Sequence, residues 1–425
     1  MLLGFSLLLF ALLLIGMPVA FSLMIAGIVG MYLFLGGQIA FTQIPVIAYK
    51  TLDDFGITAV PLYIFMSNLL LKGKVGNGLF ELGNKWLGHF PGGLGIATVF
   101  ACAIFAAISG SSVATAVTVG AMAIPEMISR NYERSLVLGT VAAGGTLGIL
   151  IPPSIPMILY GGITNESVGK LFMSGVMPGV LMTLLFIMYV VFRAKDMPQQ
   201  PKASWDERIA VLKETAWGLF LPILVVGGIY TGLFTPTEAA AVGTVYSLFI
   251  TFVIYRTVKI SDLPEVFRAS VKTSSMIFAI MIGAMIFGFI LTALQVPQAI
   301  MGLVTDGNLN RWVVFFGINI VLLVLGCVLE TVSIILITLP MIYPVLKFLG
   351  FDLIWFNVVM LINMELALIS PPVGMNLFVI KGISPESSLQ QIIKGAMPFV
   401  AIMVAEVVLL CIFPEIATWL PSVVK

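Results

Sequence analysis

Charged residues are scarce in this sequence. They make up 10% of its 425 residues, whereas hydrophobic residues make up 60%, and the mean hydropathy is +1.12. Soluble domains carry about a quarter charged residues. A soluble fold of this length could not bury so much apolar surface, so lipid must surround much of the chain. We therefore expect an all-α integral membrane protein.

Residues that usually carry enzyme or metal chemistry are also few. The three cysteines lie inside apolar runs, with no pairing or metal-ligand spacing, and the single histidine, His89, supports neither a metal site nor a catalytic triad. A net charge of +1 indicates no nucleic-acid partner. The first basic residue is Lys50, so the N-terminal apolar run lacks the charged start of a signal peptide and is expected to be the first membrane helix.

The chain contains an internal repeat. Short motifs recur 218 to 220 residues apart: 162–167 with 382–387, 175–178 with 395–398, 151–153 with 370–372, Pro125 with Pro344, and 17–18 with 235–236. Such a constant offset predicts two tandem copies of one unit. We expect a first repeat over 1–200, a cytoplasmic linker over 201–216 and a second repeat over 217–425.

Each repeat is expected to contain five crossings and one re-entrant hairpin. The predicted segments are 2–16, 18–35, 58–71, hairpin 92–128, 136–160 and 176–192, then 217–234, 237–254, 273–293, hairpin 312–346, 355–380 and 396–413. An odd number of crossings gives the repeats opposite orientations, a pattern typical of secondary transporters. The loops on one side then hold 16 of the 21 basic residues, so that side is expected to be cytoplasmic and both termini periplasmic.

Two stretches of mixed polarity precede the third crossing of each repeat. Residues 38–55 and 257–271 are expected to be interfacial helices, with ordinary loops as the alternative.

Each repeat has two interruptions at places where a continuous helix is expected. One is the hairpin tip, at 107–115 and 326–333, and the other is the crossing that follows, at 144–154 and 363–376. A proline pair cannot lie inside a continuous helix but can start a new half-helix. Because unpaired backbone groups are not tolerated in lipid, these breaks must line a polar cavity. An alternative is that the small residues only let helices pack closely.

The breaks offer oxygen ligands for a small cation and helix N-termini for an anionic substrate. The residues expected at cation sites are Ser109, Gly110, Ser111, Ser112, Gly145, Thr146, Gly148, Gly326, Glu330, Thr331, Asn363 and Glu365. Those expected near the substrate are Thr115, Pro153, Ser154, Ser333, Pro372, Gly374 and Asn376. Glu406 lies away from any break and is expected at a helix contact or a subunit interface.

Several of these motifs carry a family resemblance. The segment 227–241 (GGIYTGLFTPTEAAA) looks like the hallmark of the large membrane subunit (DctM type) of TRAP, or tripartite ATP-independent periplasmic, transporters, and 108–116 and 151–154 also fit. The resemblance implies an elevator-type secondary transporter of the bacterial inner membrane that imports an organic acid with sodium, Na⁺, bound at two or more sites. It also implies a small four-helix membrane subunit and a periplasmic substrate-binding protein as partners.

The resemblance leaves the substrate open. Sialic acid is the leading expectation, with a C4-dicarboxylate or another sugar acid as the alternative. An intramembrane enzyme would need paired aspartates or a Ser/His constellation inside crossings, which this sequence lacks. A proton-translocating subunit of a respiratory complex would need a line of ionisable lysines across the membrane, whereas every lysine here maps to a loop or a helix end.

Overall fold

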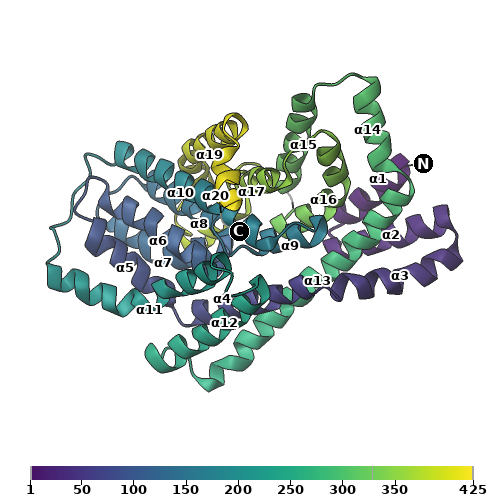
Figure 1. Ribbon diagram of the computed structural model, residues 1–425. Coiled ribbons are helices and arrows are strands. Elements are labelled where there is room, and N and C mark those ends of the chain that lie inside the picture. The colour runs from purple at the N-terminus through teal and green to yellow at the C-terminus, as the bar shows by residue number, and fades with distance from the viewer. Residues whose placement is uncertain (1, 328, 424–425) are drawn as a thin grey trace.

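All regular structure in the described residues is helical. The computed structural model describes residues 2–327 and 329–423 (Figure 1). The helices of the first half are α1 (Leu2–Leu14), α2 (Val19–Leu35), α3 (Gly37–Leu52), η1 (Phe55–Thr58), α4 (Ala59–Lys72), α5 (Val75–Leu87), α6 (Gly93–Ser109), α7 (Ser112–Ser129), α8 (Arg134–Leu150), α9 (Ile155–Thr164) and α10 (Val168–Arg193).

The second half repeats this order. Its helices are α11 (Trp205–Tyr230), α12 (Pro236–Phe249), η2 (Ile250–Ile254), η3 (Ile260–Asp262), α13 (Leu263–Ala293), α14 (Val296–Asp306), α15 (Arg311–Gly326), α16 (Thr331–Phe348), α17 (Leu353–Ile369), α18 (Met375–Ile383), α19 (Leu389–Ile412) and α20 (Glu415–Val423). For example, α7 begins at Ser112 and α16 at Thr331, 219 residues later. The helix starts therefore follow the offset of the sequence motifs.

The two halves interlock through a long framework of helices. α2 packs along α13, and α4 packs along α12 (Figure 1). Small residues bring α2 and α13 together, because a Cβ atom on Gly27 would lie 2.7 Å from Ile286 and one on Gly283 would lie 2.7 Å from the carbonyl oxygen of Ala20. Close approach through small residues is how membrane helices commonly associate.

Both predicted hairpins are present as helix pairs with a short tip. α6 and α7 cover the segment expected at 92–128, and α15 and α16 cover the one expected at 312–346. Both predicted broken crossings are present too, as α8 with α9 and α17 with α18. α10 and α19 begin eight and seven residues earlier than expected, because Ser167 and Ser388 cap their first turns.

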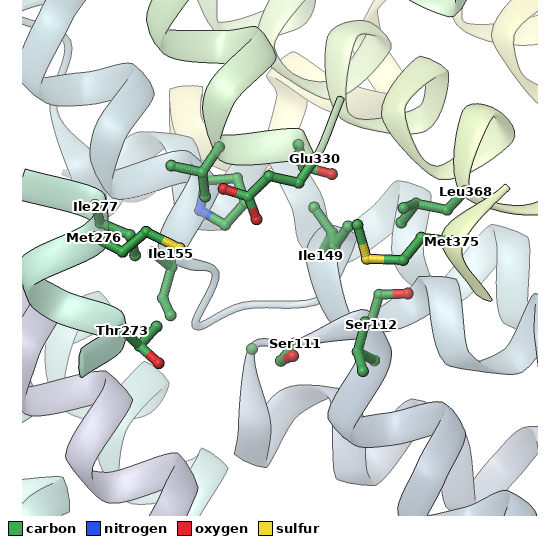
Figure 2. A pocket seen from close by; sticks show the side chains of 15 residues that line it. Ser111, Ser112, Ile149, Ile155, Thr273, Met276, Ile277, Glu330, Leu368 and Met375 are labelled. Atoms are coloured by element: carbon green, nitrogen blue, oxygen red, sulfur yellow. The ribbon is translucent and has the colours of Figure 1, made fainter. Parts of the chain in front are cut away.

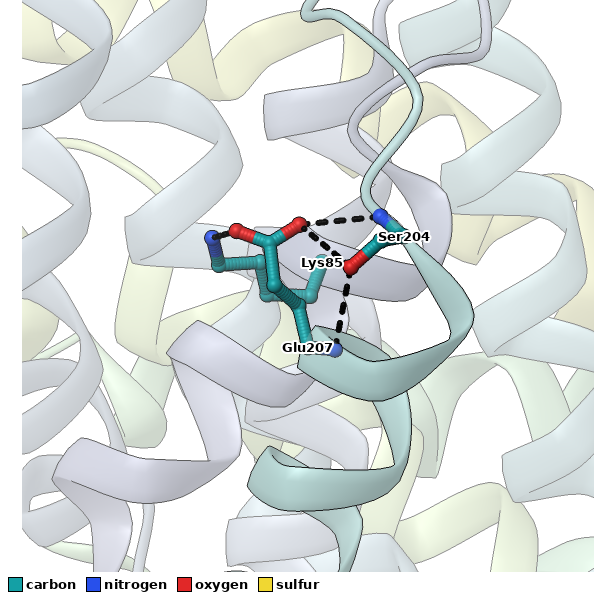
Figure 3. Close-up of polar contacts among 3 residues, drawn as sticks. All are labelled: Lys85, Ser204 and Glu207. Atoms are coloured by element: carbon teal, nitrogen blue, oxygen red, sulfur yellow. Dashed lines mark hydrogen bonds and ion pairs between the residues drawn. The ribbon is translucent and has the colours of Figure 1, made fainter.

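The predicted linker over 201–216 is wrong for most of its length. α11 begins at Trp205, where Ser204 and Glu207 form a capping box that satisfies the first amides of the helix. Glu207 also accepts a hydrogen bond from Lys85 on α5 at 2.9 Å (Figure 3). The polar composition of these residues indicated a linker, whereas the cap and the ion pair make them the first turns of a helix joined to α5.

Other boundaries also differ from the sequence prediction. The stretch at 38–55 contains a separate helix, α3, but most of 257–271 belongs to the same helix as the crossing expected at 273–293. An ion pair between Lys72 and Glu265, at 2.6 Å, holds the start of this longer helix, α13, against the end of α4. The sequence prediction missed α5, α14 and α20, which are short and have charged or polar residues on one face.

The outer surface is strongly apolar. Nine helical segments among the described residues are long and apolar enough to cross a membrane. Large apolar side chains such as Leu184 on α10 and Ile223 on α11 point outward. Exposed apolar area on this scale needs a lipid solvent, so the fold is that of a multi-pass membrane protein.

Candidate functional site

The tip of the first hairpin is a tight polar turn between α6 and α7. Gly110 ends α6 with a φ of +60°, and a Cβ atom there would lie 2.6 Å from the carbonyl oxygen of Pro153. Only glycine therefore fits this turn, for reasons of both backbone conformation and space. The turn places the first hairpin tip directly against the break between α8 and α9.

Hydrogen bonds within this tip fix its polar groups. The Ser109 and Thr115 hydroxyl groups lie 3.1 Å apart, and Thr115 donates to the carbonyl oxygen of Ser111 at 2.8 Å. Ser111 caps α7 by accepting from the amide of Ala114 at 3.4 Å. The predicted residues Ser109 and Thr115 thus support the turn from below rather than facing a ligand.

Glycines on α8 allow the first hairpin to lie against the broken helix. A Cβ atom on Gly148 would lie 2.5 Å from the carbonyl oxygen of Ser111, and one on Gly145 would lie 2.7 Å from the Ala116 side chain. The neighbouring Thr146 is fully buried and donates to the carbonyl oxygen of Ala143 at 2.7 Å. These three predicted cation-site residues therefore lie at the packing surface of the tip.

The first break is a buried irregular segment. Pro152, Pro153 and Ser154 are all buried, and the Ser154 hydroxyl group has no hydrogen-bond partner in the part of the chain that the structure describes. The proline pair was expected to start the half-helix, but it lies in the break itself. α9 begins at Ile155, and Pro156 occupies its first turn, where a missing N–H costs nothing.

The second hairpin tip meets the second break in a similar way but with different side chains. A Cβ atom on Gly326 would lie 2.4 Å from the Ala367 side chain, and the Cys327 sulfur lies 3.7 Å from the carbonyl oxygen of Pro371. Glu330 precedes α16 and accepts a hydrogen bond from Ser333 at 3.4 Å. Ser333 therefore orients Glu330.

Asn376 connects the second break to the first hairpin. Gly374, with a φ of +59°, precedes α18, and Asn376 lies in the first turn of that helix. Its side-chain amide donates to the Ser112 hydroxyl group at 2.7 Å and to the carbonyl oxygen of Ala142 at 3.3 Å. Residues predicted for the substrate and for a cation are therefore in direct contact, across the two halves.

These tips and breaks surround a cavity of about 160 Å³. The predicted residues that line it are Gly110, Ser111, Ser112, Glu330 and Thr331. Figure 2 shows Glu330 on one side of the cavity and Ser111 and Ser112 on the opposite side. None of the residues that line this cavity is basic, so an anion here would depend on helix N-termini and on bound cations.

Sequence reasoning missed one wall of the cavity. α13 contributes Thr273, Met276 and Ile277, and Met375 at the start of α18 adds a second thioether (Figure 2). α13 has no helix break or buried charge that marks it as functional. The only signal available was its pairing with the predicted hairpins in a repeat fold, which does not identify single residues.

Several predicted residues lie away from the cavity. Asn363 on α17 donates to the side chain of Asn319 on α15, and Glu365 is buried near Glu406 of α19. Pro372 is exposed at the second break. Glu406 itself is fully buried, which agrees with the expected helix contact and disagrees with the alternative of an outer subunit interface.

Comparisons with known proteins identify the family. Residues 6–416 match the family described as "Tripartite ATP-independent periplasmic transporter, DctM component". The C4-dicarboxylate TRAP transporter large permease protein of Pseudomonas aeruginosa is 40% identical over 88% of each chain. The corresponding protein of Rhodobacter capsulatus is 36% identical over 98% of this chain and 97% of its own.

More distant proteins share the fold. The sialic acid TRAP large permease protein of Vibrio cholerae is 31% identical over 96% of this chain and 95% of its own. The YdaH transporter of Alcanivorax borkumensis superposes with a TM-score of 0.65 at 13% identity, over 91% of this chain and 89% of its own. The hallmark motifs, the membrane fold and these relatives agree that the chain belongs to the DctM family of large membrane subunits of TRAP transporters, which are permeases rather than enzymes.

Proposed function

We propose that this chain is the permease subunit of a sodium-coupled importer of C4-dicarboxylates in a bacterial inner membrane. Curated C4-dicarboxylate permeases are 40% and 36% identical to it, whereas the sialic acid permease is 31% identical. This order supports the dicarboxylate, the alternative in the sequence prediction, over sialic acid. Related permeases named for isethionate and ectoine show that the family handles other small polar solutes.

The observation that carries this proposal is the cavity between the two hairpin tips and the two breaks. Its polar groups are the hydroxyl groups of Ser111, Ser112 and Thr331 and the carboxylate of Glu330. These are hard oxygen ligands of the kind that suit small cations. Sodium held at the tips would offset the charge of a dicarboxylate, which no basic side chain in the cavity wall does.

The proposal includes the movement and the orientation of the molecule. The interlocked helices α2, α4, α12 and α13 are the scaffold, and the hairpins and broken helices are the part that carries the substrate across as an elevator. Both termini are periplasmic. A cysteine at Asn77 on α5 and another at Leu303 on α14, both exposed positions, should react from opposite faces of the membrane. Labelling from one face would contradict the inverted orientation.

The proposal also includes two partners, a small membrane subunit and a periplasmic binding protein that delivers substrate. The test is uptake of succinate into proteoliposomes that contain all three proteins, with an inward sodium gradient. Succinate uptake should exceed uptake of N-acetylneuraminate, and replacing sodium by choline should abolish it. Uptake by this chain alone, or sodium-independent uptake, would contradict the proposal.

Side-chain variants connect this test to the cavity. Glu330→Gln keeps the size of the side chain but removes its charge, and it should raise the sodium concentration needed for half-maximal uptake. Glu415→Gln, at an exposed position on α20, is the matched control. Equal sodium dependence in the two variants would exclude Glu330 as a sodium ligand.

A further inference from the structure

Two glutamates are buried away from the cavity. Glu365 on α17 and Glu406 on α19 are both 0% exposed, and none of their carboxyl oxygens has a hydrogen-bond partner among the described residues. The two carboxyl groups are close enough to interact electrostatically, and α17 packs against α19. Neither residue lines the cavity between the tips.

The surroundings of this pair are also negative. Leu150, the last residue of α8, lies beside the Glu365 carboxyl group, and α8 packs against both α17 and α19. The final turn of a helix has carbonyl oxygens without intrahelical partners and carries the negative end of the helix dipole. No lysine, arginine or histidine contributes an ion pair to either glutamate among the described residues.

Electrostatics does not permit this arrangement to stand uncompensated. Removing one carboxylate from water costs several kcal/mol even after the protein relaxes. Two carboxylates that share a site cannot both remain ionised without a counter-charge. Half-helix C-terminal ends are also the places where transporters coordinate sodium.

We propose that Glu365 and Glu406, together with carbonyl oxygens at the end of α8, bind a sodium ion at a site separate from the cavity. One carboxylate and one neutral carboxyl group then surround a single positive charge, and the site has no net charge. This inference rests on the proposed sodium coupling. It adds Glu406, which the sequence placed at no break, as a ligand.

The position of the pair suggests what this ion does. Glu365 lies on the half-helix that leads to the second break, and Leu150 lies immediately before the first break. An ion bound between them therefore holds the two broken helices together beneath the cavity. Sodium binding here would organise the cavity before the substrate enters.

The test uses glutamine substitutions, because glutamine has the size of a protonated glutamate but cannot become an anion. Glu365→Gln and Glu406→Gln are compared with the exposed control Glu415→Gln in the complete three-protein transporter. The readouts are the stabilisation of the purified chain by NaCl relative to choline chloride, and the Hill coefficient of uptake for sodium. Each buried variant should need at least about tenfold more sodium, which corresponds to about 1.4 kcal/mol, and should lower the Hill coefficient by about one.

The outcomes are separable. If both glutamine variants respond to sodium as the parent does, the pair is a protonated structural contact and the sodium site is refuted. If a glutamine variant does not fold, Glu406→Asp keeps the charge and shortens the side chain, and its sodium affinity should fall while the control is unchanged; an unchanged affinity refutes the site. Absence of sodium dependence in the parent would instead refute the proposed function.

Discussion

The two hairpins have the same helix order but differ in how closely they contact the broken helix beside them. In the first half, α8 carries Gly144, Gly145 and Gly148 along the surface that faces the hairpin, and the hairpin lies within van der Waals contact of all three. α6 is consequently buried along most of its length. The first hairpin is therefore an interior element of the protein.

In the second half, the corresponding positions of α17 are occupied by larger residues. Asn363, Met364 and Ala367 stand 219 residues after those three glycines. Side chains at these positions keep α16 away from α17, and one face of α15 is left exposed, as at Val313 and Ile320. Glycine against side chain is thus enough to make one hairpin buried and the other peripheral.

The breaks differ in the same direction. Ser154 in the first break is fully buried, whereas Val373 in the second is 41% exposed. The arm helices that precede the hairpins follow the pattern, since α5 is joined to α11 by the Lys85–Glu207 ion pair while α14 packs mainly on α13 and α16. Fewer buried contacts mean a lower cost of local opening. We therefore expect the second hairpin to be the one that opens to admit substrate.

The largest effect is expected from removing the glycine contact of the first hairpin. Gly148→Ala would place a Cβ atom 2.5 Å from the carbonyl oxygen of Ser111, which is backbone and cannot turn aside. Overpacking of this kind costs roughly 1–3 kcal/mol, and it should lower both the melting temperature and uptake. Ala367→Gly is the matched change in the second half and should preserve uptake. Equal tolerance of both changes would contradict the difference between the hairpins.

The next effect concerns the hydrogen bond between the halves. Asn376→Ala removes the donor to Ser112 and leaves a buried hydroxyl group with one partner fewer, at a cost of roughly 1–3 kcal/mol. Because Asn376 lies beside the cavity rather than at the buried glutamate pair, the substrate concentration for half-maximal uptake should rise more than the sodium concentration. If only the sodium requirement changes, Asn376 belongs to a cation site.

Native cysteines offer a smaller but direct comparison of the two hairpins. Cys327 at the second tip is half-exposed, whereas Cys102 in the first hairpin is buried. A water-soluble maleimide should modify Cys327 and spare Cys102, and the rate at Cys327 should fall when sodium and succinate are present. Peptide mapping by mass spectrometry gives both rates in the wild-type chain. Reaction at Cys102 would show that the first hairpin also opens.

The smallest effect is expected at the anchored arm of the first half. Partial desolvation, together with the positive charges of Arg208 and Lys202, lowers the pKa of His89 below its ordinary value of 6.5. The unfolded chain then binds more protons than the folded chain just below pH 6.5, so stability falls as the pH decreases through that value. His89→Gln should flatten this part of the curve of melting temperature against pH. A curve that is the same for the variant would exclude His89 as the cause.

Sequence reasoning found the architecture because the breaks and the repeat are written in glycine and proline spacing. It placed both hairpins, both broken helices and five of the residues that line the cavity. It could not assign Thr273 and Met276, because a continuous apolar helix shows no sign of which face meets a cavity. It also could not show that Glu365 and Glu406 lie together, since that depends on how α17 and α19 pack.

The contact between Asn376 and Ser112 has a consequence for how the protein is made. The two residues are 264 positions apart in the sequence. At roughly 5–20 residues per second, synthesis of the intervening chain takes on the order of tens of seconds. During this time the first hairpin is already in the membrane without its partner from α18. We expect nascent chains that end before α18 to leave this hairpin open, and so to be recognised by membrane quality-control proteases.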